Sequence, residues 1–316
     1  MIDRTTTPNA TKVCAVVVTY NRKALLEKCL KALLNQTRPL DEIIVVDNAS
    51  TDGTNDFVKE HFPSISYIRQ AENMGGAGGF HEGMKVAYEK GHDWIWVMDD
   101  DAIPTADALE KLTSFPLINE HNVYSLASAV LKQDGSISIV HRRLFHKKEM
   151  KEEVIGVDKY DESCFETDTA SFVGLLVSRK AIKEVGLPIA EFFIYNDDVE
   201  YSLRIREKGI ILTVPSSRII HLQNWEDSKK SQLRQSALSW KDYYAIRNSF
   251  YVRLKYGKPG PKYYANVLLL TVFSILTILI FRRSRYESIK VVVRGTLDGL
   301  HGKLGRNRDF LPPRPN

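Results

Sequence analysis

The chain has 316 residues, 43% of them hydrophobic and 26% charged, which are ordinary proportions for a folded protein and exclude extensive disorder. This length fits one large α/β domain, alone or with a helical appendage. The formal net charge of +5 arises mainly near the C-terminus. Such a basic end favours an anionic membrane surface over nucleic acid, because no zinc-binding, helix-turn-helix or aromatic RNA-binding motif accompanies it.

Strands and helices are expected to alternate through the first third of the chain. Apolar, β-branched runs predict buried strands, and apolar residues at helical spacing predict the helices between them. The expected strands are Val13–Thr19, Asp41–Asp47, Ile65–Arg69 and Trp94–Met98, and the expected helices are Lys23–Gln36, Thr54–His61 and Gly79–Lys90. This alternation is typical of a mostly parallel, Rossmann-like α/β sheet with flanking helices, which binds ligands at the carboxyl ends of its strands.

The alternation becomes looser in the middle of the chain. Strands are expected at Val123–Leu131, Ser136–Val140 and Ser171–Ser178, and helices at Lys180–Val185 and Val199–Lys208. The charged stretch Leu144–Lys159 is expected to form a loop.

The C-terminal part differs in composition from the rest. The aromatic-rich stretch Ser239–Leu254 predicts a helix, which also suits a contact between two copies of the chain as a homo-oligomer. Tyr263–Phe281 carries no formal charge and approaches the ~20 residues that span a bilayer. A span, a helix lying on the membrane and a buried core helix all remain open. Basic residues on both flanks favour association with the cytosolic face.

Two features indicate a cytosolic compartment. The N-terminal stretch Met1–Thr11 is polar and lacks the apolar core of a signal peptide. The three cysteines, Cys14, Cys29 and Cys164, have no metal-binding spacing and are expected to be reduced, buried thiols.

Three consecutive carboxylates, Asp99, Asp100 and Asp101, follow the expected strand Trp94–Met98. Two carboxylates separated by one residue can face one hard cation such as Mg²⁺ or Mn²⁺. A solvated acidic turn is the alternative. The position directly after an apolar strand favours the metal site.

Other polar residues also follow expected strands or precede helices. The glycine-rich stretch Asn73–Gly79 would permit close approach of a phosphate, although any glycine-rich turn looks similar. Asp47 suits either a ribose or base contact or a simple turn. Asp197, Asp198 and Glu200 suit either helix capping or a general base. His221 suits either a structural role or a metal ligand.

Five motifs together resemble inverting glycosyltransferases of family two, which have the GT-A fold. They are TYNR at Thr19–Arg22, VVDNASTDGT at Val45–Thr54, ENMGGAGGF at Glu72–Phe80, MDDDA at Met98–Ala102 and NDDVEY at Asn196–Tyr201. The resemblance covers about residues 12–225. It is strongest to bacterial galactofuranosyltransferases of the cell envelope and next to rhamnosyltransferases. The tail Val293–Gly305 also resembles the end of such envelope transferases.

The resemblance implies a role for each matching residue. Asp198 would be the catalytic base, and Asp197 and Glu200 would position acceptor or donor hydroxyls. Asp99 and Asp101 would hold Mn²⁺ or Mg²⁺ with His221, although the family's aromatic residue before this histidine is Ile220 here. The nucleotide sugar would be bound by Thr19, Tyr20, Arg22, Asp47, Asn73, Gly75, Gly76, Asp99 and Asp100.

By the same resemblance, the chain would move galactofuranose from its uridine diphosphate donor to a lipid-linked cell-envelope glycan such as O-antigen. It would act at the cytoplasmic face of the bacterial inner membrane, with inversion. The basic run from Arg142 to Lys151 suits an acceptor pyrophosphate contact or, preferably, a solvated loop. The expected organisation is a flexible N-terminus at 1–11, a GT-A domain at 12–235 and a helical, membrane-associated region at 236–316.

Three alternative functions remain. The first is a rhamnosyltransferase that uses thymidine diphosphate rhamnose. The second is a sugar nucleotidyltransferase, which would need a glycine-rich loop with a Lys or Arg where Thr19–Arg22 stands. The third is a non-catalytic membrane scaffold, against which the intact acidic motifs argue.

Overall fold

The computed structural model describes residues 11–222, 238–281 and 284–312. The expected flexible segment 1–11 therefore lies, except for Thr11, outside the described residues.

Strands and helices alternate from the start of the described chain, as expected. The elements are β1 (Val13–Thr19), α1 (Lys23–Leu34), β2 (Glu42–Asp47), α2 (Thr54–His61), β3 (Ser66–Arg69), α3 (Gly75–Glu89) and β4 (Trp94–Asp99). Helix α3 begins four residues earlier than the expected start at Gly79, because the glycines are part of the helix and not of a loop before it.

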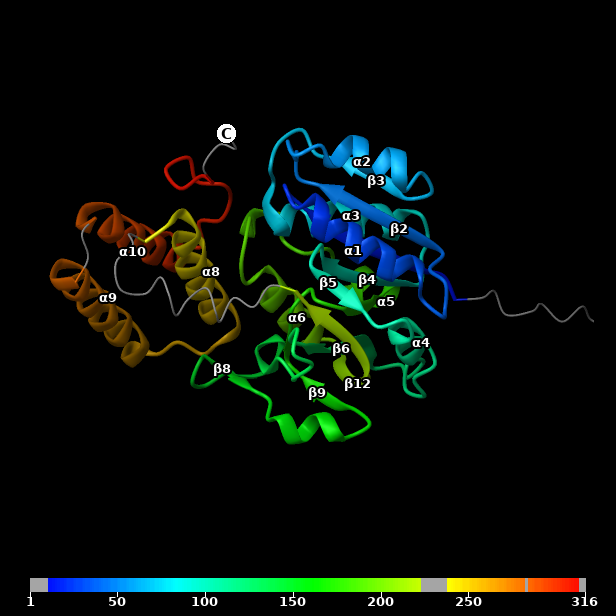
Figure 1. Cartoon of the computed structure of the whole chain (residues 1–316). Coiled ribbons are helices and arrows are strands. Elements are labelled where there is room, and N and C mark those ends of the chain that lie inside the picture. Colours follow the sequence, from blue (N-terminus) through cyan, green and yellow to red (C-terminus); the bar gives the residue numbers. More distant parts are fainter. Residues whose placement is uncertain (1–10, 223–237, 282–283, 313–316) are drawn as a thin grey trace, which may run out of the picture.

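The four strands β1 to β4 are mutually parallel and lie in the order β3-β2-β1-β4. Thr19 pairs with Asp47 across β1 and β2, and Val18 pairs with Asp99 across β1 and β4. This register brings the polar residues that end each strand to one edge of the sheet (Figure 1).

The second part of the large sheet is mixed rather than purely parallel. Its elements are β5 (Ala102–Pro104), α4 (Ala108–Thr113), β6 (Val123–Leu131), β9 (Phe165–Thr167), β11 (Leu175–Ser178), α5 (Arg179–Val185), α6 (Asp197–Arg206) and β12 (Ile210–His221). The sheet continues in the order β4-β11-β6-β12-β5, and β11 runs antiparallel to both of its neighbours. The expected strand Ser171–Ser178 is shorter in the structure, where β11 begins at Leu175.

A second, three-stranded sheet contains β7 (Arg142–His146), β8 (Lys151–Val154) and β10 (Thr169–Ala170). The prediction of a loop over Leu144–Lys159 was wrong, because this stretch forms the antiparallel β7–β8 hairpin and then the 3₁₀ turn Val157–Asp161. The prediction of a strand over Ser136–Val140 was also wrong. That stretch makes one isolated bridge, between Leu131 and Ile137, and enters the 3₁₀ turn Ile139–His141.

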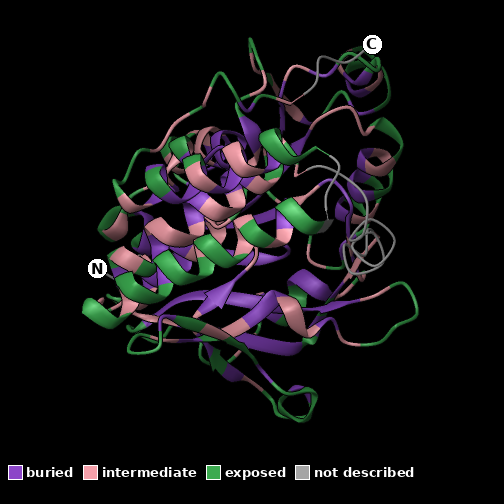
Figure 2. Cartoon of the chain, turned by 90° about the vertical axis from the view of Figure 1, so that its left-hand side faces the viewer, coloured by how far each residue is buried: buried purple, intermediate pink, exposed green. Residues whose placement is uncertain are grey.

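Two apolar clusters pack on opposite faces of the large sheet, which makes three layers. One contains side chains of α1, α2 and α4, such as Leu30, Val58 and Leu109. The other contains side chains of α3, α5 and α6, such as Met84 and Ile205. Figure 2 shows most strands of the large sheet as buried, while the helices in front of it keep exposed outer faces.

Three helices complete the described chain: α8 (Trp240–Tyr256), α9 (Pro261–Phe281) and α10 (Arg285–Leu300). A capping box begins α8, since Ser239 and Asp242 each bond the other's backbone amide. Glycines allow α10 to approach α8 closely, because a Cβ added at Gly299 would lie 2.5 Å from the carbonyl oxygen of Arg247. These helices lie together at the left of Figure 1. Helix α10 falls within the expected helical region 236–316, although its own bounds were not predicted.

Candidate active site

The carboxyl end of β4 carries the acidic triad, and strand pairing brings a histidine beside it. Asp99 is the last residue of β4, and β5 begins at Ala102. Antiparallel pairing of β12 with β5 places His221 opposite Ala102. One ligand atom each from Asp99, Asp101 and His221 therefore lies within 4.8 Å of the other two.

The electrostatics of this group are those of a compact acidic cluster. Burial, and then the charge of Asp101, raises the pKa of Asp99 well above its ordinary value. Burial also acts to raise the pKa of Asp101, but the close approach of His221 and the charge of Arg22 lower it overall. The His221 Nε2 atom lies 3.1 Å from Asp101 Oδ1, and this contact raises the pKa of His221 against the effect of burial.

The donor set suits a divalent cation. Two carboxylates and an imidazole offer oxygen and nitrogen ligands. Mn²⁺ accepts both kinds of ligand, whereas Mg²⁺ prefers oxygen. The buried Oδ1 of Asp101 lies 3.1 Å from His221 Nε2, but that contact lacks good hydrogen-bond geometry, and no other described residue bonds this oxygen. An unsatisfied buried carboxylate oxygen is costly unless a cation compensates it.

Asp100 faces away from this cluster, toward β1 and its following turn. Its Oδ2 accepts a hydrogen bond of 2.7 Å from the Thr19 hydroxyl, and its Oδ1 forms a 2.7 Å ion pair with Arg22. Arg22 also lies 3.2 Å from Asp101 Oδ2. Burial raises the pKa of Asp100 to about 6 even though Arg22 opposes that shift. Tyr20 stands half-buried between Thr19 and Arg22 at this edge.

Asp47 is fully buried at the end of β2, with both carboxylate oxygens engaged. Oδ1 accepts a hydrogen bond of 2.9 Å from the Ser50 amide, and Oδ2 accepts one from the Tyr67 hydroxyl. The Arg69 guanidinium lies 3.7 Å from Oδ2. In this conformation Asp47 orders the turn after β2, and its contact with a nucleotide stays a prediction.

The glycine-rich stretch packs against protein backbone. Asn73 Oδ1 accepts a hydrogen bond of 2.8 Å from the Gly75 amide, and the Asn48 side chain donates one of 3.0 Å to the Gly75 carbonyl. Gly75 has φ +73°, and an added Cβ would lie 1.9 Å from the carbonyl oxygen of Phe193. Gly76 has open space around it. Of these two glycines, therefore, only Gly76 leaves room for a ligand to contact its Cα.

That contact brings the start of α3 against the segment that precedes the second acidic motif. The Phe193 carbonyl also accepts a 3.2 Å hydrogen bond from the Ala77 amide. The segment then enters α6, whose first residues are Asp197 and Asp198. Because Asn48 holds Gly75 and Gly75 abuts Phe193, the end of β2, the start of α3 and the start of α6 are neighbours.

The two aspartates that begin α6 have different titration behaviour. Burial, followed by the charge of Asp198, raises the pKa of Asp197 to about 8. The pKa of Asp198 is raised to about 6 overall. Burial is the main cause; the hydrogen bond from the Val199 amide opposes it, and the charge of Glu152 adds to it. Both pKa values are therefore raised, that of Asp197 more than that of Asp198, so Asp198 is the more readily ionised of the two.

Glu200 is fully buried and makes contacts within the protein through both oxygens. Its Oε2 pairs with Arg204 at 2.9 Å, and its Oε1 receives bonds of 2.8 Å from Lys255 and 2.7 Å from the Tyr256 hydroxyl. These contacts join α6 to α8. A direct contact of Glu200 with a sugar hydroxyl stays a prediction.

Two further residues lie between the acidic motifs: His141, which no sequence pattern indicated, and Arg142, whose structural role was not predicted. The ring of His141 lies edge-on to His221, with centroids 5.2 Å apart. The neighbouring Arg142 is fully buried and donates to the carbonyls of Ser128 and Val173. Burial lowers the pKa of Arg142 to about 10, against the effect of Tyr160 and of nearby Asp198. The prediction that Arg142 belongs to a solvated basic loop or contacts an acceptor was wrong.

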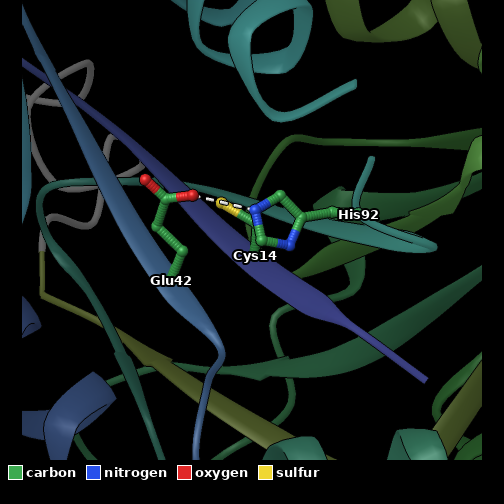
Figure 3. A group of neighbouring side chains, drawn as sticks. All are labelled: Cys14, Glu42 and His92. Atoms are coloured by element: carbon green, nitrogen blue, oxygen red, sulfur yellow. Dashed lines mark hydrogen bonds and ion pairs between the residues drawn. The ribbon is translucent and has the colours of Figure 1, made fainter. Parts of the chain in front are cut away.

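A second group of potential ligands, Cys14, Glu42 and His92, lies at the opposite end of the sheet (Figure 3). Its contacts explain it without an ion. Glu42 pairs with Lys90 and lies 2.8 Å from His92 Nε2. Burial, with the charge of Glu42 second, raises the pKa of the Cys14 thiol. A neutral thiol beside an ion pair makes a poor metal site.

The three-layer sheet with an acidic cluster at its strand ends defines a GT-A fold, the class of nucleotide-sugar transferases, and solved structures agree. The crystal structure of GalNAc-T7 with UDP, GalNAc and Mn²⁺ matches with a TM-score of 0.58 at 13% identity, over 93% of this chain and 57% of that one. The mannosyltransferase PcManGT from Pyrobaculum calidifontis, in complex with GDP-Man and Mn²⁺, matches with a TM-score of 0.55 at 16% identity, over 94% and 89%.

The sequence assigns the chain within that class. It belongs to glycosyl transferase family 2, whose model matches residues 14–186. Galactofuranosyltransferase GlfT1 of Mycolicibacterium smegmatis is 32% identical over 205 residues, which are 63% of this chain and 66% of that relative. The dTDP-rhamnosyl transferase RfbF of Shigella flexneri is 25% identical over 299 residues, 94% of this chain and 98% of that relative. The chain thus spans just under two thirds of the GlfT1 relative.

Proposed function

We propose that this chain is an inverting, metal-dependent glycosyltransferase that moves galactofuranose from its uridine diphosphate donor to a lipid-linked glycan of the bacterial cell envelope. The observation that carries the proposal is the meeting of Asp99, Asp101 and His221 at the carboxyl end of β4. The His141 ring contacts His221, and the charge of Asp198 acts on the neighbouring Arg142, which supports a base close to this cluster. Membership of the family establishes glycosyl transfer as the reaction class.

The donor sugar is proposed from the relatives. GlfT1 proteins of two mycobacterial species match with 31–32% identity, which favours galactofuranose. Rhamnose is the second candidate, because RfbF aligns over nearly the whole of both chains. If the donor sugar is rhamnose instead of galactofuranose, the roles proposed for the acidic residues stay the same.

The chain's own residues have separate proposed roles. Asp198 accepts the proton of the attacking acceptor hydroxyl, and protonated Asp197 donates a hydrogen bond that positions acceptor or donor hydroxyls. Asp99, Asp101 and His221 hold Mn²⁺ or Mg²⁺, which neutralises negative charge on the departing diphosphate when bound. The nucleotide sugar contacts the strand ends and the start of α3, at Thr19, Tyr20, Arg22, Asp47, Asn73, Gly76, Asp99 and Asp100. Gly75 is not among these contacts, because Phe193 covers its Cα.

The C-terminal helices provide the proposed membrane contact. Helix α9 is long and apolar enough to cross a bilayer by composition, with mean hydropathy 2.1 over Pro261–Ile280, and only 11% of that window is buried. A surface-bound enzyme would meet a lipid-linked acceptor at the cytoplasmic face. We accordingly propose a catalytic domain at 12–235 and a membrane-associated helical region at 236–316.

A donor screen tests the proposal directly. The purified chain is mixed with uridine diphosphate galactofuranose, uridine diphosphate galactopyranose or thymidine diphosphate rhamnose, with Mn²⁺, Mg²⁺ or a chelator, and nucleotide release is measured. We expect release from the furanose donor that the chelator abolishes and Mn²⁺ restores. Nucleotide release from thymidine diphosphate rhamnose alone would show that rhamnose, and not galactofuranose, is the donor sugar.

Two other outcomes would contradict the proposal as a whole. Pyrophosphate release from a nucleoside triphosphate and a sugar phosphate would indicate a nucleotidyltransferase. If protein with the circular dichroism spectrum of a folded chain turns over no donor with any lipid-linked acceptor, the chain would be a scaffold. The anomeric configuration of the product, measured by NMR, tests inversion separately.

A further inference from the structure

The segment that leads into Asp197 and Asp198 has an unusual backbone. Phe193, Tyr195 and Asn196 have φ values of 66°, 67° and 62°. Residues other than glycine rarely adopt positive φ, and bulky aromatic side chains do so least readily. Such strain persists only where the surrounding structure holds it, and it concentrates at functional sites.

Helix α8 provides the groups that hold this segment. The side-chain amide of Asn248 donates to the carbonyls of Phe192 at 3.0 Å, Ile194 at 2.9 Å and Tyr195 at 2.8 Å. Asn248 is fully buried, so these bonds form in an environment without competing water.

Arg247, also fully buried, fixes the orientation of that amide. Its Nε donates to Asn248 Oδ1 at 2.8 Å, which leaves only the NH₂ group of Asn248 facing the carbonyls. Its Nη2 donates to the carbonyls of Glu191 at 3.2 Å and Phe192 at 3.0 Å. Opposite α8, the start of α3 holds the Phe193 carbonyl through the Ala77 amide.

We propose that Arg247 and Asn248 are positioning residues for Asp198, which set the place of the base by holding the strained backbone between α3 and α8. The inference rests on the proposed function, because it concerns the same reaction. It makes α8, which lies outside the residues matched by the family model, part of the catalytic framework. A shift of a catalytic group by about 1 Å can lower a rate by about 100-fold.

A pair of substitutions separates the hydrogen-bonding role from a space-filling one. Asn248→Asp keeps the shape of the side chain but turns a second oxygen toward three carbonyls, and Asn248→Ala removes the donor. We expect both to lower kcat by about 10- to 100-fold with the donor KM nearly unchanged. Ser288→Ala is the matched control, because Ser288 is fully buried on the neighbouring α10 and accepts a hydrogen bond from the Leu238 amide instead.

A pH profile distinguishes positioning from general loss of stability. Four charged or titratable groups act on Asp198. Asp197 lies on the same helix, and the small sheet carries the other three, Arg142, Arg143 and Glu152. Loosening of the segment admits water to Asp198, so the acidic limb of kcat should move to lower pH in Asn248→Ala. A partly unfolded population would lower kcat without moving this limb.

Several outcomes would overturn the inference. Asn248→Asp with the kcat and pH profile of the unaltered chain would do so, as would equal losses in Ser288→Ala. If the Asn248 variants do not fold, Arg247→Lys replaces them; it keeps the charge and loses the planar fork, and an unchanged kcat would again contradict the inference. Transfer retained by Asp198→Asn would instead refute the proposed base, which keeps the two failures distinguishable.

Discussion

Asp197 and Asp198 are adjacent carboxylic acids whose surroundings separate their pKa values, to about 8 and about 6. Neighbouring titratable groups with separated pKa values are a common basis for assigning an acid and a base. The lower of the two belongs to Asp198, which is also the more exposed to solvent. Of the pair, Asp198 is therefore the group that can accept a proton near neutral pH.

Replacing the base tests that assignment. Asp198→Asn keeps the shape and the hydrogen bond to the Val199 amide but cannot accept a proton. We expect kcat for transfer to fall by about 10²- to 10⁴-fold. Calorimetric titration should show donor affinity within about twofold of the unaltered chain. Equal losses of affinity and rate would contradict the role, and Asp56→Asn, exposed on α2, controls for the change of charge.

The pH dependence of transfer follows from the same group. Asp198 acts in its deprotonated form, and burial raises its pKa to about 6. The rate should therefore rise as pH increases through about 6 and should level off above it. Measuring kcat from pH 4.5 to 8 with saturating donor checks this. An acidic limb at the ordinary aspartate pKa near 4 would show that another group carries the proton.

At the scale of single residues, the sequence identified the ends of the strands but not the contacts there. Asp99 and Asp101 were predictable from their place after an apolar strand. His221 was ambiguous from sequence, and only the pairing of β12 with β5 brings it to the carboxylates. The engagement of Asp100 by Thr19 and Arg22, and the burial of Arg142, depend on tertiary packing that no local pattern encodes.

At the scale of elements, hydrophobic runs predicted β1, β2 and β4 almost to the residue, because these strands are buried on both faces. The edge strand β3 was also predicted, although its residues are only partly buried or exposed. The antiparallel insertion of β11 between β4 and β6 was not predictable, since strand direction leaves no trace in composition. The charged β7–β8 hairpin resembles a loop in sequence because its side chains are mostly solvated. The glycines that begin α3 favour a later helix start in sequence, because glycine usually disfavours helix interiors.

The glycines of α3 have a packing explanation. Gly79 and Gly83 lie on the face of α3 that contacts β1, where an added Cβ would lie 2.5 Å from Val18 and 2.4 Å from Val16. Gly75 lies one turn earlier and abuts Phe193. Glycine at every fourth residue thus allows the helix to approach the sheet and the segment before Asp197.

A substitution at Gly75 should therefore be costly. Gly75→Ala forces alanine into φ +73° and places its Cβ against the Phe193 carbonyl. We expect the free energy of unfolding to fall by about 2–4 kcal/mol, measured by urea denaturation. Gly76→Ala is the matched control. Its Cβ meets nothing within 4 Å, so it should stabilise α3 by about 0.5–1 kcal/mol. Equal effects of the two would contradict the packing role.

At the scale of the whole molecule, the connections of α9 restrict how it can meet a membrane. Helix α9 joins α8 to α10, and these two pack closely where Gly295 and Gly299 face α8. A spanning α9 would place α8 and α10 on opposite sides of the bilayer and separate this contact. Because α8 also holds the segment before Asp198, we expect α9 to lie in the membrane surface, with its ends on one side.

Removing apolar surface from α9 should release the protein from membranes. Leu269 and Phe273 are 67% and 66% exposed, so Leu269→Asp with Phe273→Asp should leave the fold intact. Burial of each side chain in lipid stabilises binding by about 1.5–3 kcal/mol, so we expect the double variant to lose at least ~100-fold in partition. Co-flotation with anionic vesicles measures this. Leu34→Asp, at an exposed leucine of α1, is the control and should float with the unaltered chain. Flotation of the double variant to the same extent would show that α9 does not carry the membrane contact.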